Sequence, residues 1–225
     1  IIDDGFNLKH EDLKGLHVSF EYDATSKNMS TEPKYSIDFH GTLVAGVIFG
    51  RRNSFGVDGI APQAKLIAIR QTTNLTSDVI LAFTVASLAS ADIINCSWNS
   101  PMLLEPIYDT IVNIAKNGRD GKGVAVVFSA GNSSSFLEVN SSESAIEEVI
   151  TVGASQKYSN YGDVVDIILK SGIKSTYKNG YENFSGTSAT ASMVSGLLAL
   201  EMEQNRSLHV SDLLENLKKR LKSNE

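Results

Sequence analysis

The stretch VAVVFSAGN, residues 124–132, is a short apolar run that ends in small residues and an amide. Similar runs elsewhere in the chain are KLIAIR (65–70), DIINCSW (92–98), VITVGAS (149–155) and VVDIILK (164–170). Near-continuous apolar runs of this length, rich in β-branched residues, predict strands that are buried on both faces.

Segments with helical spacing lie between these runs. They are HGTLVAGVIFG (40–50), SDVILAFTVASLASA (77–91) and LEPIYDTIVNIAKNG (104–118). Strands that alternate with helices favour a parallel sheet covered by helices on both faces, so the sequence predicts a three-layer α/β fold with a mainly parallel sheet. In such sheets the functional residues gather beyond the carboxyl ends of the strands. Near the end of the chain, Asn179-Gly180 within STYKNGY (175–181) is typical of a hairpin turn.

The composition predicts one soluble domain spanning residues 1–225. The chain is 42% hydrophobic, and its formal charge of -6 argues against nucleic acid as a partner. No apolar run is long enough for a membrane span. The opening IIDDG (1–5) resembles the end of a buried strand, so we expect a domain trimmed at its N-terminus. The single cysteine, Cys96, excludes an internal disulfide.

The segment FSGTSATASMVSGLLAL, residues 184–200, places many small polar residues before an apolar helical run. A helix start needs only one Ser, Thr, Asp or Asn as a cap. A first turn also offers free N–H donors and the positive end of the helix dipole, which suit an anion or a nucleophile. Taken alone, the segment is also consistent with a capped helix packed closely on a neighbour.

Four polar residues follow predicted strands or begin predicted helices. Asp3 ends IIDDG, His40 opens HGTLVAG, Asn132 ends VFSAGN, and Ser188 lies in FSGTSA. Acyl transfer by a serine needs a nucleophile, a base, an acid that orients the base, and a donor to the oxyanion. Each residue alone could be a turn or cap residue, but together they supply all four groups.

With these motifs the chain resembles the subtilisin-like serine proteases over nearly its whole length. The motifs that match are IIDDG (1–5), HGTLVAG (40–46) and SGTSATAS (185–192), and GVDGIAPQAKLIAIR (56–70) also resembles the segment after the family's histidine helix. The doubled acid, the dipeptide Ser97-Trp98 and the segment GRDGKG (118–123) resemble the kexin-like branch.

The resemblance implies a role for each of the four residues. Asp3 would orient His40, His40 would act as general base and then general acid, and Ser188 would be the nucleophile. Asn132 would donate its side-chain amide to the oxyanion, together with the Ser188 backbone N–H. Asp4 is the less favoured acid, because the first Asp of the family motif carries out this role.

Two positions depart from the family pattern. Ser192 stands where the family usually has proline; because a first-turn proline is favourable but dispensable, we expect lost rigidity and retained chemistry. The substrate-binding strand usually reads Ser-X-Gly, whereas this chain has Ser97-Trp98-Asn99, and a side chain at Asn99 is expected to narrow the cleft.

The resemblance also assigns residues that bind substrate. These are Ser97, Trp98, Asn99, Gly131 and Glu143. Kexin-like enzymes cleave after basic residues because acids line the first specificity pocket. Glu143 is a candidate for such an acid, whereas residues 100–103 contain none. The alternative is a solvated loop glutamate among several others.

A structural calcium ion is a further implication of the resemblance. The expected ligands are the side chains of Asp12 and Asn53 and the carbonyls of Arg51, Phe55 and Val57. The positive charges of Arg51 and Arg52 favour the alternative, a loop without an ion. No cofactor is expected for catalysis.

These observations favour a serine endopeptidase, secreted or extracytoplasmic by family resemblance, that acts on proteins or peptides. A propeptide or a protein inhibitor is a candidate partner. The alternative is a catalytically inactive subtilase-fold module that binds peptides. An α/β-hydrolase esterase is disfavoured, because the residues around Ser188 do not form G-x-S-x-G.

Overall fold

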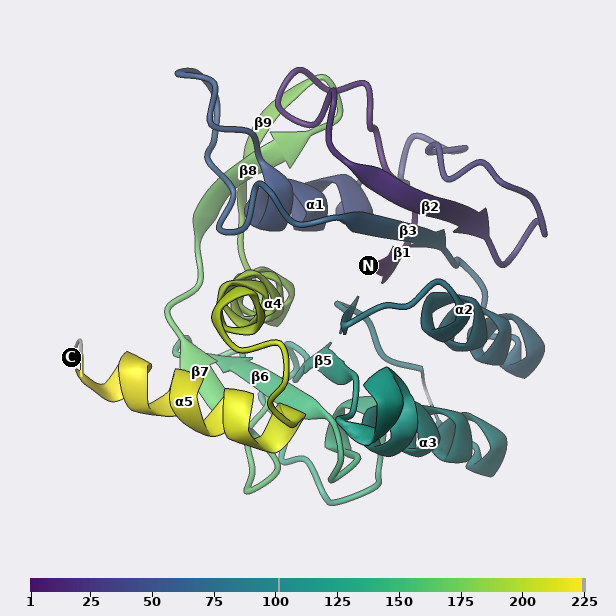
Figure 1. Ribbon diagram of the computed structural model, residues 1–225, viewed down its shortest axis with the longest axis vertical. Coiled ribbons are helices and arrows are strands. Elements are labelled where there is room, and N and C mark those ends of the chain that lie inside the picture. The colour runs from purple at the N-terminus through teal and green to yellow at the C-terminus, as the bar shows by residue number, and fades with distance from the viewer. Residues whose placement is uncertain (101, 224–225) are drawn as a thin grey trace.

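A seven-stranded parallel sheet forms the centre of the molecule (Figure 1). The computed structural model describes residues 1–100 and 102–223. In spatial order the strands are β2 (Val18–Asp23), β3 (Leu66–Arg70), β1 (Ile2–Asp3), β4 (Ile93–Cys96), β5 (Ala125–Ser129), β6 (Ile150–Ala154) and β7 (Ile167–Leu169). Every neighbouring pair is parallel, so the predicted parallel sheet is confirmed.

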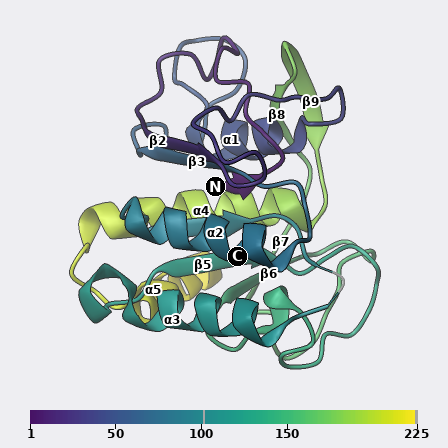
Figure 2. The same ribbon diagram turned by 90° about the vertical axis from the view of Figure 1, so that its right-hand side faces the viewer.

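Helices cover both faces of this sheet, as predicted (Figures 1 and 2). On one face lie α2 (Thr76–Leu88) and α3 (Glu105–Gly121). On the other lie α1 (His40–Phe49), α4 (Thr187–Gln204) and α5 (Val210–Ser223), with α4 packed on β4, β5 and β6. Among the described residues, no helix combines the length and hydropathy that a bilayer crossing requires.

The helices at the centre of the molecule differ from those at its surface. Nine of the ten residues of α1 are buried, and so are the first six residues of α4, Thr187 to Ser192. A helix buried on most sides has no need of a polar stripe. By contrast, α5 places Leu213 and Leu217 against the core and its charged residues outward.

The hairpin predicted around Asn179-Gly180 is also present. Strands β8 (Ile173–Tyr177) and β9 (Gly180–Phe184) are antiparallel, and the hairpin lies against α1 (Figure 1). Ser175 Oγ donates to the Leu43 carbonyl at 2.6 Å, and Thr176 Oγ1 donates to the Thr42 carbonyl at 2.7 Å. These bonds fix the hairpin to the helix that begins with His40.

One strand of the sheet was not predicted. β2 lies at an edge of the sheet, and its burial pattern is mixed rather than continuous. The polar residues Ser19 and Glu21 alternate with apolar residues along it. An edge strand with alternating polarity lacks the continuous apolar run by which the other strands were found.

Candidate active site

The four predicted catalytic residues all lie near the end of a strand or the start of a helix. Asp3 ends β1, His40 begins α1, Asn132 follows β5, and Ser188 is the second residue of α4. β1 and β5 are parallel strands of one sheet, separated by β4, so their carboxyl ends lie at the same edge.

A hydrogen-bonded pair joins Asp3 and His40. His40 Nδ1 lies 2.9 Å from Asp3 Oδ1 and 3.1 Å from Oδ2, and Asp3 is buried. Because the carboxylate accepts, Nδ1 carries the proton and Nε2 of a neutral ring is an acceptor. Burial of the ring lowers the pKa of His40, but the charge and hydrogen bond of Asp3 and the charge of Asp4 outweigh it and raise the pKa above 6.5.

Ser188 is buried in the first turn of α4. Its Oγ donates to the Ser97 carbonyl at 3.2 Å, and within the described residues no hydrogen bond joins it to His40. In proteins without substrate, hydrogen bonds between nucleophile and base are often long and tighten when substrate binds. The Ser97 hydroxyl in turn donates to the Ser188 carbonyl at 3.3 Å.

The start of α4 is held by Asn132 rather than by one of the helix's own hydroxyls. Gly186 occupies the N-cap position and has no side chain that could cap the helix. Asn132 Oδ1 accepts from the Thr187 N–H at 2.9 Å and from Thr187 Oγ1 at 3.1 Å. With its oxygen occupied, Asn132 presents Nδ2 as a donor.

The surroundings of Gly131 and Ser192, two positions close in sequence to the predicted catalytic residues, show which residue types fit there. Gly131 has φ of +98°, and a Cβ there would lie 2.5 Å from Asn160 Nδ2, so this position needs glycine. Ser192 is the sixth residue of α4 and therefore lies beyond the first turn, so the reasoning from a first-turn proline was wrong. Its hydroxyl instead donates to the Ser188 carbonyl at 2.7 Å.

A cavity of about 290 Å³ adjoins the Asp3–His40 pair. Of the predicted substrate-binding residues, Ser97, Trp98 and Asn99 line it, and Gly131 and Glu143 do not. The Trp98 indole donates to the Ile2 carbonyl at 2.8 Å, and Asn99 Nδ2 donates to the Ser129 carbonyl at 3.2 Å. Both side chains are therefore held by strand ends.

Sequence reasoning missed the opposite wall of this cavity, residues 71–74. A usable signal was present in the sequence. The polar segment QTTN directly follows the predicted strand KLIAIR, and polar residues after a buried strand mark the functional edge of a parallel sheet.

Glu143 lies in a short 3₁₀ helix (Glu143–Ala145) and is fully buried, so the alternative of a solvated loop glutamate was wrong. Oε2 accepts from the Ser100 N–H at 3.1 Å. Oε1 is buried and has no hydrogen-bond partner among the described residues. A buried carboxylate oxygen without a partner is costly, which makes Glu143 a candidate for binding a donor from outside the chain.

Three of the predicted calcium-binding residues contact the fully buried Asp12, but each does so through an N–H donor and not through an oxygen. Its Oδ1 accepts from Asn53 Nδ2 at 2.7 Å, and its Oδ2 accepts from the Val57 N–H at 2.8 Å. The Arg51 N–H donates to the Asp12 carbonyl, and the Phe55 N–H to Asn53 Oδ1. Within the described residues, no group of three His, Cys, Asp or Glu side chains could hold a metal.

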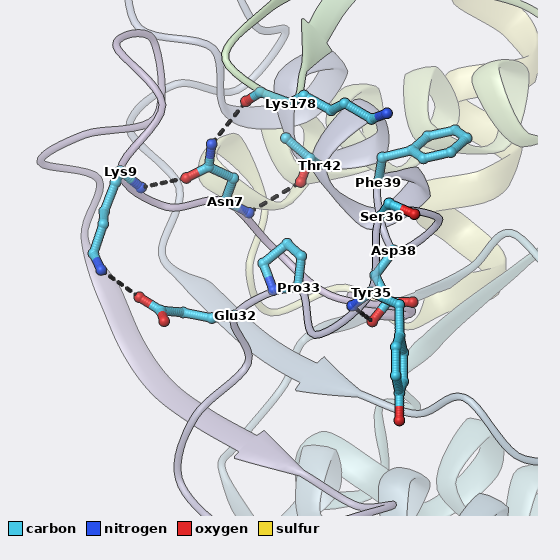
Figure 3. Close-up of a pocket in the computed structure, with 10 residues that line it drawn as sticks. All are labelled: Asn7, Lys9, Glu32, Pro33, Tyr35, Ser36, Asp38, Phe39, Thr42 and Lys178. Carbon is cyan, nitrogen blue, oxygen red and sulfur yellow. Dashed lines mark hydrogen bonds and ion pairs between the residues drawn. The ribbon is translucent and has the colours of Figure 1, made fainter.

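A larger cavity, of about 400 Å³, lies beside the start of α1 and contains none of the predicted catalytic residues (Figure 3). Phe39, the residue before His40, lines it together with Lys178 at the hairpin turn. Asn7 donates to the Lys178 carbonyl at 2.7 Å, and Lys9 pairs with Glu32 at 2.6 Å. The Asn7 N–H also donates to Thr42 Oγ1 of α1 at 3.0 Å (Figure 3), so Asn7 joins the hairpin turn to the helix.

Fold and site together define an α/β protein of the serine-peptidase class. A family model described as the subtilase family (peptidase S8) matches residues 1–224. The chain therefore belongs to the subtilase family, and the subtilisin-like fold is confirmed.

Three curated relatives illustrate the similarity. A calcium-dependent protease of Nostoc sp. is 29% identical over 97% of this chain. A thermophilic serine proteinase of Bacillus sp. (strain AK1) is 32% identical over 92%, and kexin of Candida albicans is 29% identical over 95%. The chain spans 40%, 52% and 25% of the lengths of these relatives, respectively.

A solved structure supports the same assignment. The crystal structure of a cold-adapted subtilisin-like serine proteinase superposes with a TM-score of 0.80 at 27% identity. The match covers 95% of this chain and 78% of that one.

Proposed function

We propose that this chain is a serine endopeptidase domain that hydrolyses peptide bonds. The observation that carries the proposal is the hydrogen bond from His40 Nδ1 to the buried Asp3 carboxylate, at the strand edge where Ser188 begins a helix. This bond leaves His40 Nε2 to accept the serine proton. An inactive peptide-binding module would need none of these groups, so their joint presence favours the enzyme.

In the proposed reaction, Ser188 Oγ attacks the scissile carbonyl carbon while His40 Nε2 takes the hydroxyl proton. The Asp3 carboxylate stabilises the resulting imidazolium. The negative charge on the former carbonyl oxygen is stabilised by Asn132 Nδ2 and by the Ser188 N–H in the first turn of α4, where the helix dipole also contributes.

Collapse of this intermediate breaks the C–N bond, and His40 gives its proton to the leaving amine. Water then enters and loses a proton to His40 as it attacks the acyl carbon. A second tetrahedral intermediate collapses, the bond to Ser188 Oγ breaks, and the serine regains its proton.

Covalent labelling by a fluorophosphonate tests this proposal. The unmodified protein should react, and Ser188→Ala should not. Ser185→Ala is the matched control, because Ser185 is an exposed serine of the same motif and should leave labelling unchanged. A folded protein that resists the reagent would instead favour the inactive binding module.

We propose further that Glu143 selects substrates with a basic residue before the scissile bond. Its buried Oε1 has no partner in the described structure, and its Oε2 binds Ser100, which directly follows the segment 97–99. A buried charge-assisted hydrogen bond is worth about 1.5–3 kcal/mol, or roughly tenfold to a hundredfold in discrimination.

Cleavage profiling on a mixed peptide library tests the role of Glu143. Glu143→Gln should abolish a preference for Arg or Lys, whereas Glu138→Gln, at an exposed position in the same loop, should preserve it. An apolar preference in the unmodified enzyme would exclude this specificity.

We also propose a structural calcium ion held by Asp12 and Asn53. The oxygens of a carboxylate, an amide and backbone carbonyls are the donors that calcium prefers. Asn53 Nδ2 lies 2.7 Å from Asp12 Oδ1, so the Asn53 amide would have to turn and release the Phe55 N–H to offer its oxygen to the ion. The calcium-dependent protease of Nostoc sp. supports the idea by its name.

Chelation provides the test for calcium. EDTA should lower the melting temperature of the unmodified protein but leave that of Asp12→Asn unchanged. An unmodified protein that melts at the same temperature with EDTA and with added calcium contradicts the proposal.

Family membership also supports an extracytoplasmic location, protein or peptide substrates, and a propeptide or protein inhibitor as a partner. A globular inhibitor of subtilisin-like proteases that blocks fluorophosphonate labelling would support the proposal of an inhibitor as a partner. Unchanged labelling at saturating inhibitor would count against it.

A further inference from the structure

Both acids of IIDDG bind the same histidine. Asp3 binds the ring of His40, and Asp4 binds its backbone. Asp4 Oδ2 accepts from the His40 N–H at 3.1 Å, and Asp4 Oδ1 accepts from the Gly41 N–H at 2.8 Å. Phe39, at the N-cap position of α1, has no side-chain oxygen that could make these bonds. Asp4 therefore caps α1 from a different element, the end of β1.

The end of β1 and the start of α1 are also in direct contact. A Cβ at Gly41 would lie 2.5 Å from the Gly5 carbonyl oxygen and 3.0 Å from Asp3 Cβ. The helix start therefore lies against Asp3 and Gly5, the residues on either side of Asp4. Any shift of this turn relative to β1 would also move the His40 imidazole relative to Asp3.

We propose that Asp4 is a positioning residue that fixes the His40 backbone against β1 and adds a second negative charge in support of the imidazolium. The inference rests on the proposed function, in which His40 gains a proton during the reaction. Asp3 would act on the ring from Nδ1, and Asp4 would act through the backbone and through its charge.

The charges around Asp4 fit this role. Burial and the neighbouring Asp3 charge raise the pKa of Asp4 to about 6, against the lowering effect of the two N–H bonds and of His40. Asp3 and His40 are the titratable groups that share its cavity in the described part of the chain. Arg70, opposite Asp3 in β3, directs its guanidinium to Asp23 and Asp38 instead.

Asp4→Asn and Asp4→Ala separate the effect of the Asp4 charge from the effect of the helix cap. Asn removes the charge and keeps an oxygen acceptor for one of the two N–H groups, so the pKa of His40 should fall and the acid limb of kcat/KM should move to lower pH. Ala also removes the cap, and a misplaced imidazole should lower kcat by about tenfold to a hundredfold with little change in KM. Asp120→Asn, at an exposed position, is the control and should leave both unchanged.

The pKa of His40 can also be measured without any activity, by NMR titration of Ser188→Ala with and without Asp4→Asn. This readout separates failure of the inference from failure of the proposed function, and it remains available if Asp4→Ala does not fold. An unchanged His40 pKa together with unchanged kcat in Asp4→Asn would overturn the inference. A loss confined to KM for substrates with a cationic side chain would also overturn it, because Asp4 would then bind substrate.

Discussion

At Asn132, the side-chain oxygen accepts two hydrogen bonds, both from Thr187. The oxygen accepts from Thr187 and so fixes the start of α4, which leaves the nitrogen to donate to substrate. In the proposed function, Asn132 would both order the helix that carries Ser188 and bind the oxyanion. Replacing it should therefore affect the transition state more than the bound substrate.

Asn132→Ala should lower kcat by about 10²–10³ with little change in KM, because one oxyanion donor is lost. Steady-state kinetics on a peptide substrate gives both constants. Ser133→Ala, at the next and exposed position, serves as the control. Unchanged turnover in Asn132→Ala would show that another group binds the oxyanion.

The pH dependence of activity is also set by single residues, His40 and Asp3. Because the pKa of His40 is raised above 6.5, the ring loses its proton and becomes a base at a pH above 6.5. Hence kcat/KM should rise with pH through a midpoint above 6.5. In Asp3→Asn this midpoint should fall, because the carboxylate charge is gone. A midpoint at or below 6.5 in the unmodified protein would contradict the argument.

At the scale of elements, a buried ion-pair network fixes the segment that leads into α1. Arg70, at the end of β3, is 1% exposed and pairs with Asp23 at the end of β2 and with Asp38 just before α1. Asp38 also accepts from the Lys34 and Tyr35 N–H groups. The network therefore ties two strand ends to the residues that precede His40.

Arg70→Met should lower the free energy of unfolding by about 3–5 kcal/mol, because it removes the buried cation that Asp23 and Asp38 share and leaves Asp38 without an ion-pair partner among the described residues. Chemical denaturation followed by circular dichroism measures this change. Arg52→Met removes an exposed arginine and should have little effect. A loss below about 1 kcal/mol in Arg70→Met would place the stabilisation of this segment elsewhere.

The sequence predicted those strands and helices that show a recognisable pattern within a few consecutive residues. Continuous apolar runs identified β3 to β7, and motif ends located Asp3 and His40, which the structure joins. Interactions between distant segments were not predictable in this way. Asp4 caps a helix that begins 36 residues later, and Glu143 is buried although its neighbours in sequence are polar.

At the scale of the whole molecule, the site draws on residues from near both ends of the chain. The single tryptophan, Trp98, lies between these parts, because it lines the cleft, donates to Ile2 and packs on Phe128 with ring centroids 5.8 Å apart. Its fluorescence therefore reports on the packing of the sheet beneath the site.

Loss of labelling at Ser188 and the change in Trp98 fluorescence should share one midpoint during urea unfolding, because the site residues lie on this sheet and on the helices α1 and α4 packed against it. Both signals can be followed in the same samples. Labelling lost at clearly lower urea than fluorescence would show that the site opens before the sheet does.

The position of β1 also affects how the protein folds. Ile2 pairs with Ile69 on one side and with Cys96 on the other, so β1 lies between two strands that follow it in the sequence. Contacts this distant in sequence form slowly, since a long loop must close before they form. Asp3 thus reaches His40 only when the central strands have assembled, and a partly made chain should be unable to cleave itself or its neighbours.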